Sequence, residues 1–199
     1  MLEAALSSEY IDEIIVVNDG STDTTREVLE SYENHRLFVI HLEKNKWKLW
    51  AFLEGVSVAH GTHIIMLDAD YSWFSSAHLT QMILPVLHGE VDSTMIMWHE
   101  SLFICKMLKH DIFSGSRVLP RSVFDDPSFR EGKSFWLEAK INEVLYIRKL
   151  RVKSLYFPEV HNPPKWLRQL IWKQPRDILS TIPLWKIMRQ AWYFFRQQR

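Results

Sequence analysis

The sequence predicts an α/β fold: a Rossmann-like, mostly parallel sheet flanked by helices, followed by a C-terminal amphipathic helical tail. Three apolar runs in the first seventy residues have the length and β-branched content of strands. Segments with helical spacing separate these runs. Alternation of strands and helices at this spacing indicates βαβ units with right-handed crossovers.

The first run, EIIVVND at 13–19, is unbroken, as expected for a strand buried on both faces. LFVIHL at 37–42 and THIIMLD at 62–68 are the next two strands. Between them, 22–34 and 49–61 place apolar residues three and four positions apart, which predicts two helices. Beyond residue 75 we expect helices at 76–89, 100–109 and 134–149 and strands at 93–98, 115–119 and 152–157.

The composition is that of a globular chain. Of 199 residues, 47% are hydrophobic and 24% charged, which excludes a disordered or linker-rich protein. The lone Cys105 excludes a disulfide framework and a cysteine-based zinc site. No secretory signal pattern opens the chain, and no long uninterrupted apolar run predicts a transmembrane helix.

Charge divides the chain into a domain at 1–164 and a basic, Trp-rich tail at 165–199. The tail holds eight Lys or Arg and one Asp, whereas the domain holds sixteen basic and twenty-three acidic residues. From Leu184 to Phe195, apolar side chains occupy one helical face and cationic or Gln side chains the other. This helix either docks on the core or lies on an anionic membrane. We favour the membrane, and expect a cytoplasmic protein held peripherally on its cytoplasmic face, with no nucleic-acid partner.

Two acidic loops follow predicted strands, where ligands bind in parallel α/β sheets. One is Asn18–Asp19–Gly20–Ser21, and the other is Asp68–Ala69–Asp70. Carboxylates in this position suit a hard cation such as Mg²⁺ or Mn²⁺, which usually completes its shell with phosphate. A D-x-D sequence alone is a weak signal, because short acidic pairs are common in solvated turns.

In combination, these motifs resemble family 2 glycosyltransferases of the GT-A fold. The resemblance rests on EIIVVNDGSTD, on Asn45 and Lys48 before an apolar strand ending in DAD, and on the segments 114–124 and 134–157. It covers roughly residues 10–165. Its closest likeness is to the branch that transfers sugars to polyprenyl phosphates, such as dolichol-phosphate mannosyltransferase.

The resemblance implies metal-dependent, inverting transfer of a sugar from a UDP- or GDP-sugar to a lipid-linked or polyprenyl phosphate acceptor, in cell-wall or other glycan biosynthesis. It implies a role for each candidate residue. The nucleotide side comprises Asn18, Asp19, Gly20, Ser21, Lys48 and Asp68. The Mg²⁺ or Mn²⁺ ligands are Asp68, Asp70 and His161, and the catalytic or acceptor-side residues are Glu138, Arg117 and Arg121. Without the resemblance, Glu138 is more simply a solvated helix residue, Arg117 half of an ion pair and His161 a surface group.

Some features depart from the family pattern. The family begins with a strand that ends in a Pro-x-x-Asn-Glu-like stretch, so the domain is interpreted as N-terminally truncated. Trp47, Leu49 and Trp50 stand where the family has small residues. No Gln-x-x-Arg-Trp is found, so a processive polysaccharide synthase is not expected.

Two other functions are considered. A truncated, inactive glycosyltransferase-like domain could persist as a membrane-associated binding module. A haloacid-dehalogenase-type phosphatase would use Asp68 as nucleophile and Asp70 as acid and base. That enzyme also needs a later acidic pair at a strand end, and Asp125–Asp126 follows no predicted strand.

Overall fold

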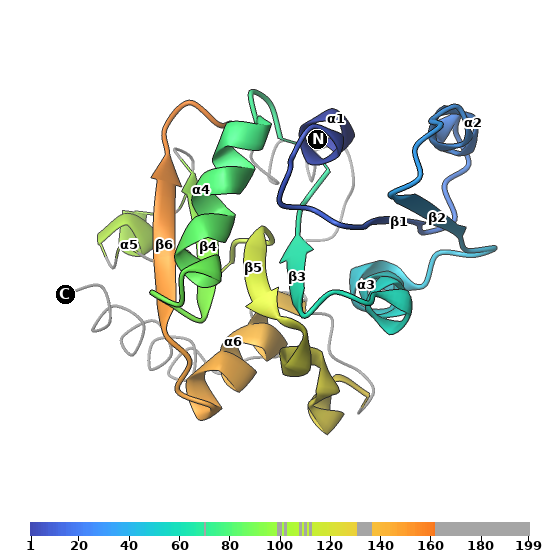
Figure 1. Cartoon of the computed structure of the whole chain (residues 1–199). Helices are drawn as coiled ribbons and strands as arrows, with labels where there is room; N and C mark the ends of the chain where they lie inside the picture. Colours follow the sequence, from blue (N-terminus) through green and yellow to red (C-terminus); the bar gives the residue numbers. More distant parts are fainter. Residues whose placement is uncertain are drawn as a thin grey trace.

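A computed structural model describes residues 1–69, 71–98, 101, 103–107, 109, 111, 113–130 and 137–161 (Figure 1). The predicted tail helix at 184–195 and the rest of the basic tail at 165–199 lie outside these residues. The helices are α1 (Leu2–Leu6), α2 (Thr25–Glu30), α3 (Trp47–Val58), α4 (Ser76–Leu87), α5 (Phe103–Met107) and α6 (Leu137–Ile147), with 3₁₀ turns at Arg121–Asp125 and Pro127–Phe129. The strands are β1 (Ile14–Asn18), β2 (Leu37–His41), β3 (His63–Met66), β4 (Ser93–Trp98), β5 (Arg117–Pro120) and β6 (Val152–Phe157).

The strands form two sheets. β1 and β2 pair in parallel, joined by α2 as the sequence predicts. The larger sheet has the order β3-β5-β4-β6, in which β4 and β6 are parallel and β5 runs antiparallel to both of its neighbours. Three of its four strands therefore point the same way, and the expected α/β class with a mostly parallel sheet is confirmed.

One expectation about pairing differs from the structure. The alternation of strands and helices up to residue 68 predicts one parallel sheet, but within the described chain β3 takes β5 as its ladder partner and is not paired with β1 or β2. The two sheets share a core instead, because Val16 of β1 and Ile65 of β3 pack against the same apolar cluster. Side-chain packing, and not a continuous ladder, joins them.

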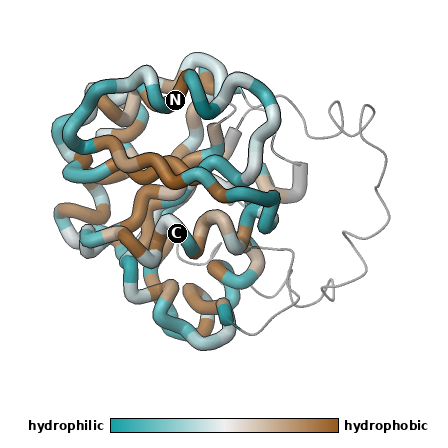
Figure 2. Tube along the Cα trace, turned by 90° about the vertical axis from the view of Figure 1, so that its right-hand side faces the viewer, coloured by the Kyte–Doolittle hydropathy of each residue, from teal (hydrophilic) through white to brown (hydrophobic). Residues whose placement is uncertain are grey.

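Two apolar clusters cover opposite faces of the larger sheet. One lies under α1 and α4 and includes Leu79, Met82 and Ile96. The other includes Ile141 and Leu145 of α6. Figure 2 shows apolar stretches running through the middle of the described chain, with polar stretches in the loops around them. No helix among the described residues is long and apolar enough to cross a bilayer.

Arg36 fastens the N-terminal segment to the start of β2. Its guanidinium donates to the backbone carbonyls of Leu6, Ser8 and Ile11, at 2.9 Å for each of the last two. The Leu6 carbonyl belongs to the last residue of α1 and the other two follow the helix, and none has a sheet partner among the described strands. One side chain therefore supplies hydrogen-bond donors to three backbone carbonyls that the sheet does not pair.

We expect Arg36→Ala to lower the free energy of unfolding by about 2–3 kcal/mol, because it leaves part-buried carbonyls without their charged donor. Urea unfolding followed by circular dichroism measures the change. Arg26→Ala is the matched control, since Arg26 makes an exposed pair with Glu30 at 3.7 Å and such pairs contribute little. Equal effects of the two substitutions would contradict the assignment.

Candidate active site

Three residues from three separate elements meet through Lys48. Its ammonium, in the first turn of α3, lies 2.6 Å from Oδ1 of Asp68, two residues beyond β3. It also lies 2.6 Å from Oε1 of Glu138, in the first turn of α6. The two carboxylates are only 15% and 12% exposed, and Lys48 is 45% exposed. A solvent-accessible cation thus covers a sheltered pair of acids.

The charges around this contact determine the protonation of Lys48. Burial alone would lower its pKa, but the negative charges of Glu138 and Asp68 outweigh that effect, and the pKa is raised. Lys48 is therefore an ammonium across the physiological range. The site already attracts positive charge, which is the electrostatic property that a divalent cation needs.

The carboxylate of Asp68 is held from several sides. The hydroxyl of Tyr71 donates to its Oδ2 at 2.9 Å, and the backbone N–H of Asp68 donates to Oγ of Ser116 at 3.2 Å. Ser116 in turn donates to the Tyr71 hydroxyl at 2.7 Å. A β-carbon on Gly115 would overlap Oδ2 of Asp68, so the present position of this carboxylate depends on the absence of a side chain at residue 115. The loop before β5 thereby fixes the predicted metal ligand.

The predicted nucleotide loop lies next to the same helix start. Oδ1 of Asp19 accepts from the backbone N–H of Lys46 at 2.6 Å. Gly20 has φ +72°, and a β-carbon there would lie 2.7 Å from the Asn45 nitrogen. The loop after β1 and the loop before α3 are in contact, which brings Asp19 close to Lys48.

Asn18 and Ser21 shape this loop. Asn18 is buried, and its Oδ1 accepts from the backbone N–H of Ser21, three residues on, at 3.0 Å. Its amide also lies 3.2 Å from Nδ1 of His41. Asn18 therefore supports the turn from within, while Ser21 is exposed on it.

Arg117 lies beneath the site. Its side chain is completely buried and donates to the Ser114 carbonyl at 2.8 Å and to Oδ1 of Asn142 at 2.6 Å. Burial lowers the pKa of Arg117 to about 10, although the negative charges of Glu138, Asp111 and Asp68 act to raise it. The guanidinium of Arg117 is therefore directed to Ser114 and Asn142 inside the protein. Its predicted contact with an acceptor or diphosphate stays a prediction.

The structure does not bring Arg121 to the site. β5 is antiparallel to β3, so Arg117 pairs with Met66 near the acidic end while Arg121 lies at the other end of the strand. There its backbone N–H donates to Thr62 at 2.9 Å and its guanidinium to the Ala59 carbonyl at 2.7 Å. Arg121 therefore binds the α3–β3 loop at one end of β3, and Asp68 follows the other end.

His161 and Asp70 belong to the metal prediction. His161 is exposed and forms an isolated antiparallel bridge with Ser72, through backbone hydrogen bonds of 3.0 and 3.3 Å. It therefore lies beside the loop that follows Asp68. Asp70 lies outside the described residues, and the described part of the chain shows no cluster of three His, Cys, Asp or Glu side chains arranged for a metal.

Sequence reasoning missed Tyr71, Gly115 and Ser116 as parts of this site. Tyr71 stands directly after the acidic motif, and its position was a usable signal. The roles of Gly115 and Ser116 depend on β5 folding back antiparallel beside β3, which no local pattern reveals.

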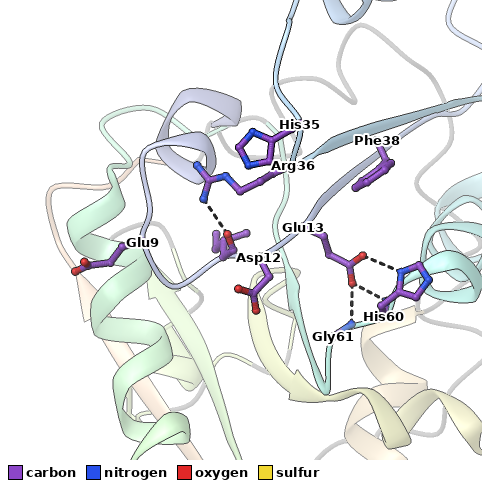
Figure 3. A pocket seen from close by; sticks show the side chains of 9 residues that line it. Glu9, Asp12, Glu13, His35, Arg36, Phe38, His60 and Gly61 are labelled. Atoms are coloured by element: carbon purple, nitrogen blue, oxygen red, sulfur yellow. Dashed lines mark hydrogen bonds and ion pairs between the residues drawn. The ribbon is translucent and has the colours of Figure 1, made fainter.

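A pocket of about 660 Å³ lies elsewhere, at the amino ends of β1 and β2 (Figure 3). Glu13 lines it and accepts from the backbone N–H groups of His60 and Gly61 at 2.6 and 2.8 Å. Burial alone would raise the pKa of Glu13, but these hydrogen bonds lower it. This carboxylate joins β1 to the α3–β3 loop and is separate from the Lys48 site.

The sequence profile described as "Glycosyl transferase family 2" matches residues 1–101, just over half of the chain. The chain belongs to glycosyl transferase family 2. The predicted enzyme class, a family 2 glycosyltransferase, is confirmed. Glu138 lies beyond the matched residues, but its contact with Lys48 and its proximity to Arg117 join it to the family's acidic motif.

Curated relatives match over short segments. A poly-β-1,6-N-acetyl-D-glucosamine synthase of Staphylococcus epidermidis is 41% identical over 71 residues, which cover 35% of this chain and 17% of the relative. A putative teichuronic acid biosynthesis glycosyltransferase of Bacillus subtilis is 38% identical over 63 residues, covering 31% and 25%. The chain therefore matches a quarter or less of the length of these relatives.

Solved structures share the GT-A fold. Glucosyl-3-phosphoglycerate synthase from Mycobacterium tuberculosis, in complex with Mn²⁺, UDP and glucosyl-3-phosphoglycerate, aligns with a TM-score of 0.64 at 14% identity, over 90% of this chain and 69% of that one. Staphylococcus aureus TarS aligns with a TM-score of 0.61 at 17% identity, over 99% and 66%. A Pyrobaculum calidifontis mannosyltransferase with GDP-Man and Mn²⁺ aligns at 0.59 and 15% identity, over 79% and 50%.

We expect Gly115→Ala to abolish cation binding at Asp68 while leaving the fold intact, because the added methyl group displaces the carboxylate from Tyr71 and Lys48. Mn²⁺ titration followed by electron paramagnetic resonance measures the loss. Gly89→Ala is the control: nothing lies within 4 Å of its β-carbon position, so the strain of an alanine at its φ of +70° should lower stability without changing Mn²⁺ affinity. Unchanged Mn²⁺ affinity in Gly115→Ala would contradict the role of Gly115.

Proposed function

We propose that this chain carries the donor-binding and catalytic centre of a metal-dependent, inverting glycosyltransferase that uses a nucleotide-diphosphate sugar. The observation that carries the proposal is the meeting of Asp68, Glu138 and Lys48 at 2.6 Å beyond the end of β3, in a chain of glycosyl transferase family 2. These groups supply a site for a cation, a base and a mobile positive charge within one hydrogen-bonded cluster.

The donor set suits a hard divalent cation. Asp68 presents a sheltered carboxylate that already binds the Lys48 ammonium, and Mg²⁺ and Mn²⁺ prefer carboxylate oxygens. Asp68 would hold the ion, with Asp70 and His161 proposed as further ligands. When bound, the ion supplies Lewis-acid stabilisation of the departing nucleoside diphosphate. Structural neighbours contain Mn²⁺ with UDP-glucose or with GDP-mannose, which supports this pairing of metal and donor.

The nucleotide is proposed to bind between the Asp19 loop and Lys48. Asp19 would lie near the base and ribose, with the Gly20 turn keeping the loop closed against Asn45. The Lys48 ammonium, on a side chain of four methylene groups, can move from the carboxylates to the diphosphate oxygens. Binding of the donor thus frees Asp68 to bind the cation and Glu138 to act as the base.

Glu138 is proposed as the general base. Its carboxylate accepts the proton of an acceptor hydroxyl while the acceptor oxygen attacks the anomeric carbon and the bond to the diphosphate breaks, which inverts that carbon. A polyprenyl phosphate acceptor would need no base, because it is already anionic at neutral pH. The 12% exposure of Glu138 beside Lys48 favours a hydroxyl acceptor. The first curated relatives are named as polysaccharide synthases, which supports the same choice.

The remaining parts of the hypothesis concern the surroundings of the enzyme. A lipid-linked acceptor, peripheral contact of residues 165–199 with the membrane and a place in cell-envelope biosynthesis are all proposed. The support is the Trp-rich, cationic sequence of that tail. The curated relatives supply a second line of support, because their names refer to extracellular or cell-wall glycans.

Isothermal titration with UDP and with GDP, with and without Mn²⁺, tests the proposed donor site. We expect metal-dependent binding of at least one nucleotide, abolished by Asp68→Asn because the cation loses a carboxylate ligand. We expect Glu138→Gln to retain nucleotide binding and to lower sugar transfer at least about 100-fold, because only the base is lost.

Binding without transfer in the unmodified chain would favour the inactive binding module. Absence of metal-dependent nucleotide binding would overturn the proposal. Hydrolysis of a phosphate ester that Asp68→Asn abolishes would instead favour the phosphatase mechanism. Asp23→Asn is the control for charge loss, since Asp23 is exposed and, within the described residues, its carboxylate accepts hydrogen bonds from Thr25.

Lys48→Ala should have opposite effects on the two ligands. Because the ammonium and the metal compete for Asp68, its removal should tighten Mn²⁺ binding in the absence of nucleotide by about tenfold. UDP or GDP binding should weaken, since the diphosphate loses a cation. Lys46→Ala is the control, because Lys46 pairs with Glu54 at 3.7 Å instead. Parallel weakening of both ligands would contradict this competition.

A further inference from the structure

Trp73 is the most exposed large apolar side chain in the described part of the chain, at 79%. It lies five residues after Asp68, in the loop between β3 and α4. Its backbone has φ +64°, a left-handed conformation that costs a side-chain-bearing residue about 1–2 kcal/mol. The fold therefore presents a large apolar ring to solvent at an energetic cost, and such strain is concentrated at functional positions.

The residues on either side of Trp73 hold its loop in place. Tyr71 is 8% exposed, and Ser72 forms two backbone hydrogen bonds with His161. On the other side, Phe74 packs against the core, with its ring 5.4 Å from that of His78. Ser75 caps α4, with its backbone N–H donating to Nδ1 of His78 at 3.0 Å. Because the residues on both sides of Trp73 are fixed by these contacts, the backbone position of Trp73 is fixed as well.

Trp73 is two residues from Tyr71, which contacts Asp68. Two residues of chain span at most about 7 Å, so its Cα is within that distance of the Cα of Tyr71. The Tyr71 hydroxyl contacts Asp68 at 2.9 Å. We therefore expect an acceptor whose terminal sugar lies beside Asp68 and Glu138 to place its next sugar ring against Trp73.

We propose that Trp73 binds the acceptor, with its indole face stacked on a pyranose ring of a neutral glycan. This proposal rests on the proposed function and names the acceptor class of the same site. The C–H face of a pyranose is apolar and carries slight positive charge, so it complements the negative face of an aromatic ring. The sugar hydroxyls at the rim stay solvated, and an exposed aromatic ring suits such a half-buried ligand.

The charge pattern favours a neutral glycan over an anionic ligand. Between Lys48 and Lys106 the sequence holds no Lys or Arg at all, and Trp73 lies near the middle of this stretch. A phosphate acceptor needs cationic partners. A tryptophan that anchors a protein to an anionic membrane usually has cations beside it. Ser72, Ser75 and Ser76 are the polar neighbours of Trp73 in the sequence, and hydroxyl groups suit the hydroxyls of a sugar.

The test uses the full chain and a β-1,6-linked N-acetylglucosamine oligosaccharide as the probe. Isothermal titration measures its Kd, alone and with UDP and Mn²⁺ present. We expect Trp73→Leu to weaken oligosaccharide binding about tenfold, because leucine keeps apolar area but has no flat face. Trp73→Phe should stay within about threefold of the unmodified chain, and the UDP–Mn²⁺ affinity should be unchanged in both variants.

Phe38→Ala is the matched control, an aromatic side chain 53% exposed on β2, and it should leave oligosaccharide binding unchanged. Equal binding by Trp73→Leu and the unmodified chain would overturn the proposal, as would no saturable oligosaccharide binding by the unmodified chain. Loss by Trp73→Leu of binding to phosphatidylglycerol vesicles or to 3-phosphoglycerate, with glycan binding intact, would also overturn it. If the chain binds the glycan through Trp73 but binds no nucleotide, the glycan-binding role of Trp73 is supported and the proposed glycosyltransferase function is rejected.

Discussion

The site depends on the ammonium of Lys48 between two sheltered carboxylates. Asp68 and Glu138 come from elements seventy residues apart, and like charges this close would repel without a shared cation. Lys48 provides that cation from α3, and the backbone N–H of Lys46 in the same segment donates to Asp19. The Lys48 charge thus joins the end of β3 to α3 and α6, while Lys46 joins the start of α3 to the Asp19 loop.

A second, fixed charge lies behind the first. Arg117 is fully buried and donates to Ser114 and Asn142, and the negative charges of Glu138 and Asp68 act to raise its pKa against the effect of burial. A buried cation that remained unpaired would be very unfavourable, so these neighbouring acids also stabilise Arg117. The two cations differ in exposure, because Arg117 is buried and fixed whereas Lys48 is 45% exposed and is the one proposed to exchange for a metal.

Much of the fold follows from local sequence pattern, because apolar spacing predicts every strand in the described chain, and every α-helix except α1, to within a few residues. The acidic strand ends were equally predictable, since Asp68 and Asp19 stand directly after apolar runs. The two arginines show the limit of such reasoning. Arg117 and Arg121 are four residues apart and look equivalent in sequence, but β5 runs antiparallel to β3 and carries them to opposite ends of it. Strand direction is a long-range property, as is the approach of Gly115 to Asp68.

The same long-range packing explains why bulky residues can stand near a site where the family has small ones. Trp47 and Trp73 both adopt positive φ, at 71° and 64°, and are 65% and 79% exposed. A left-handed backbone directs each side chain differently from a residue in an ordinary helix or strand. Their bulk is accommodated outside the protein core, beside Lys48 in one case and beyond Tyr71 in the other. Both lie on chain segments that contact the acidic centre, so aromatic surface and catalytic charge are placed next to one another by the same two loops.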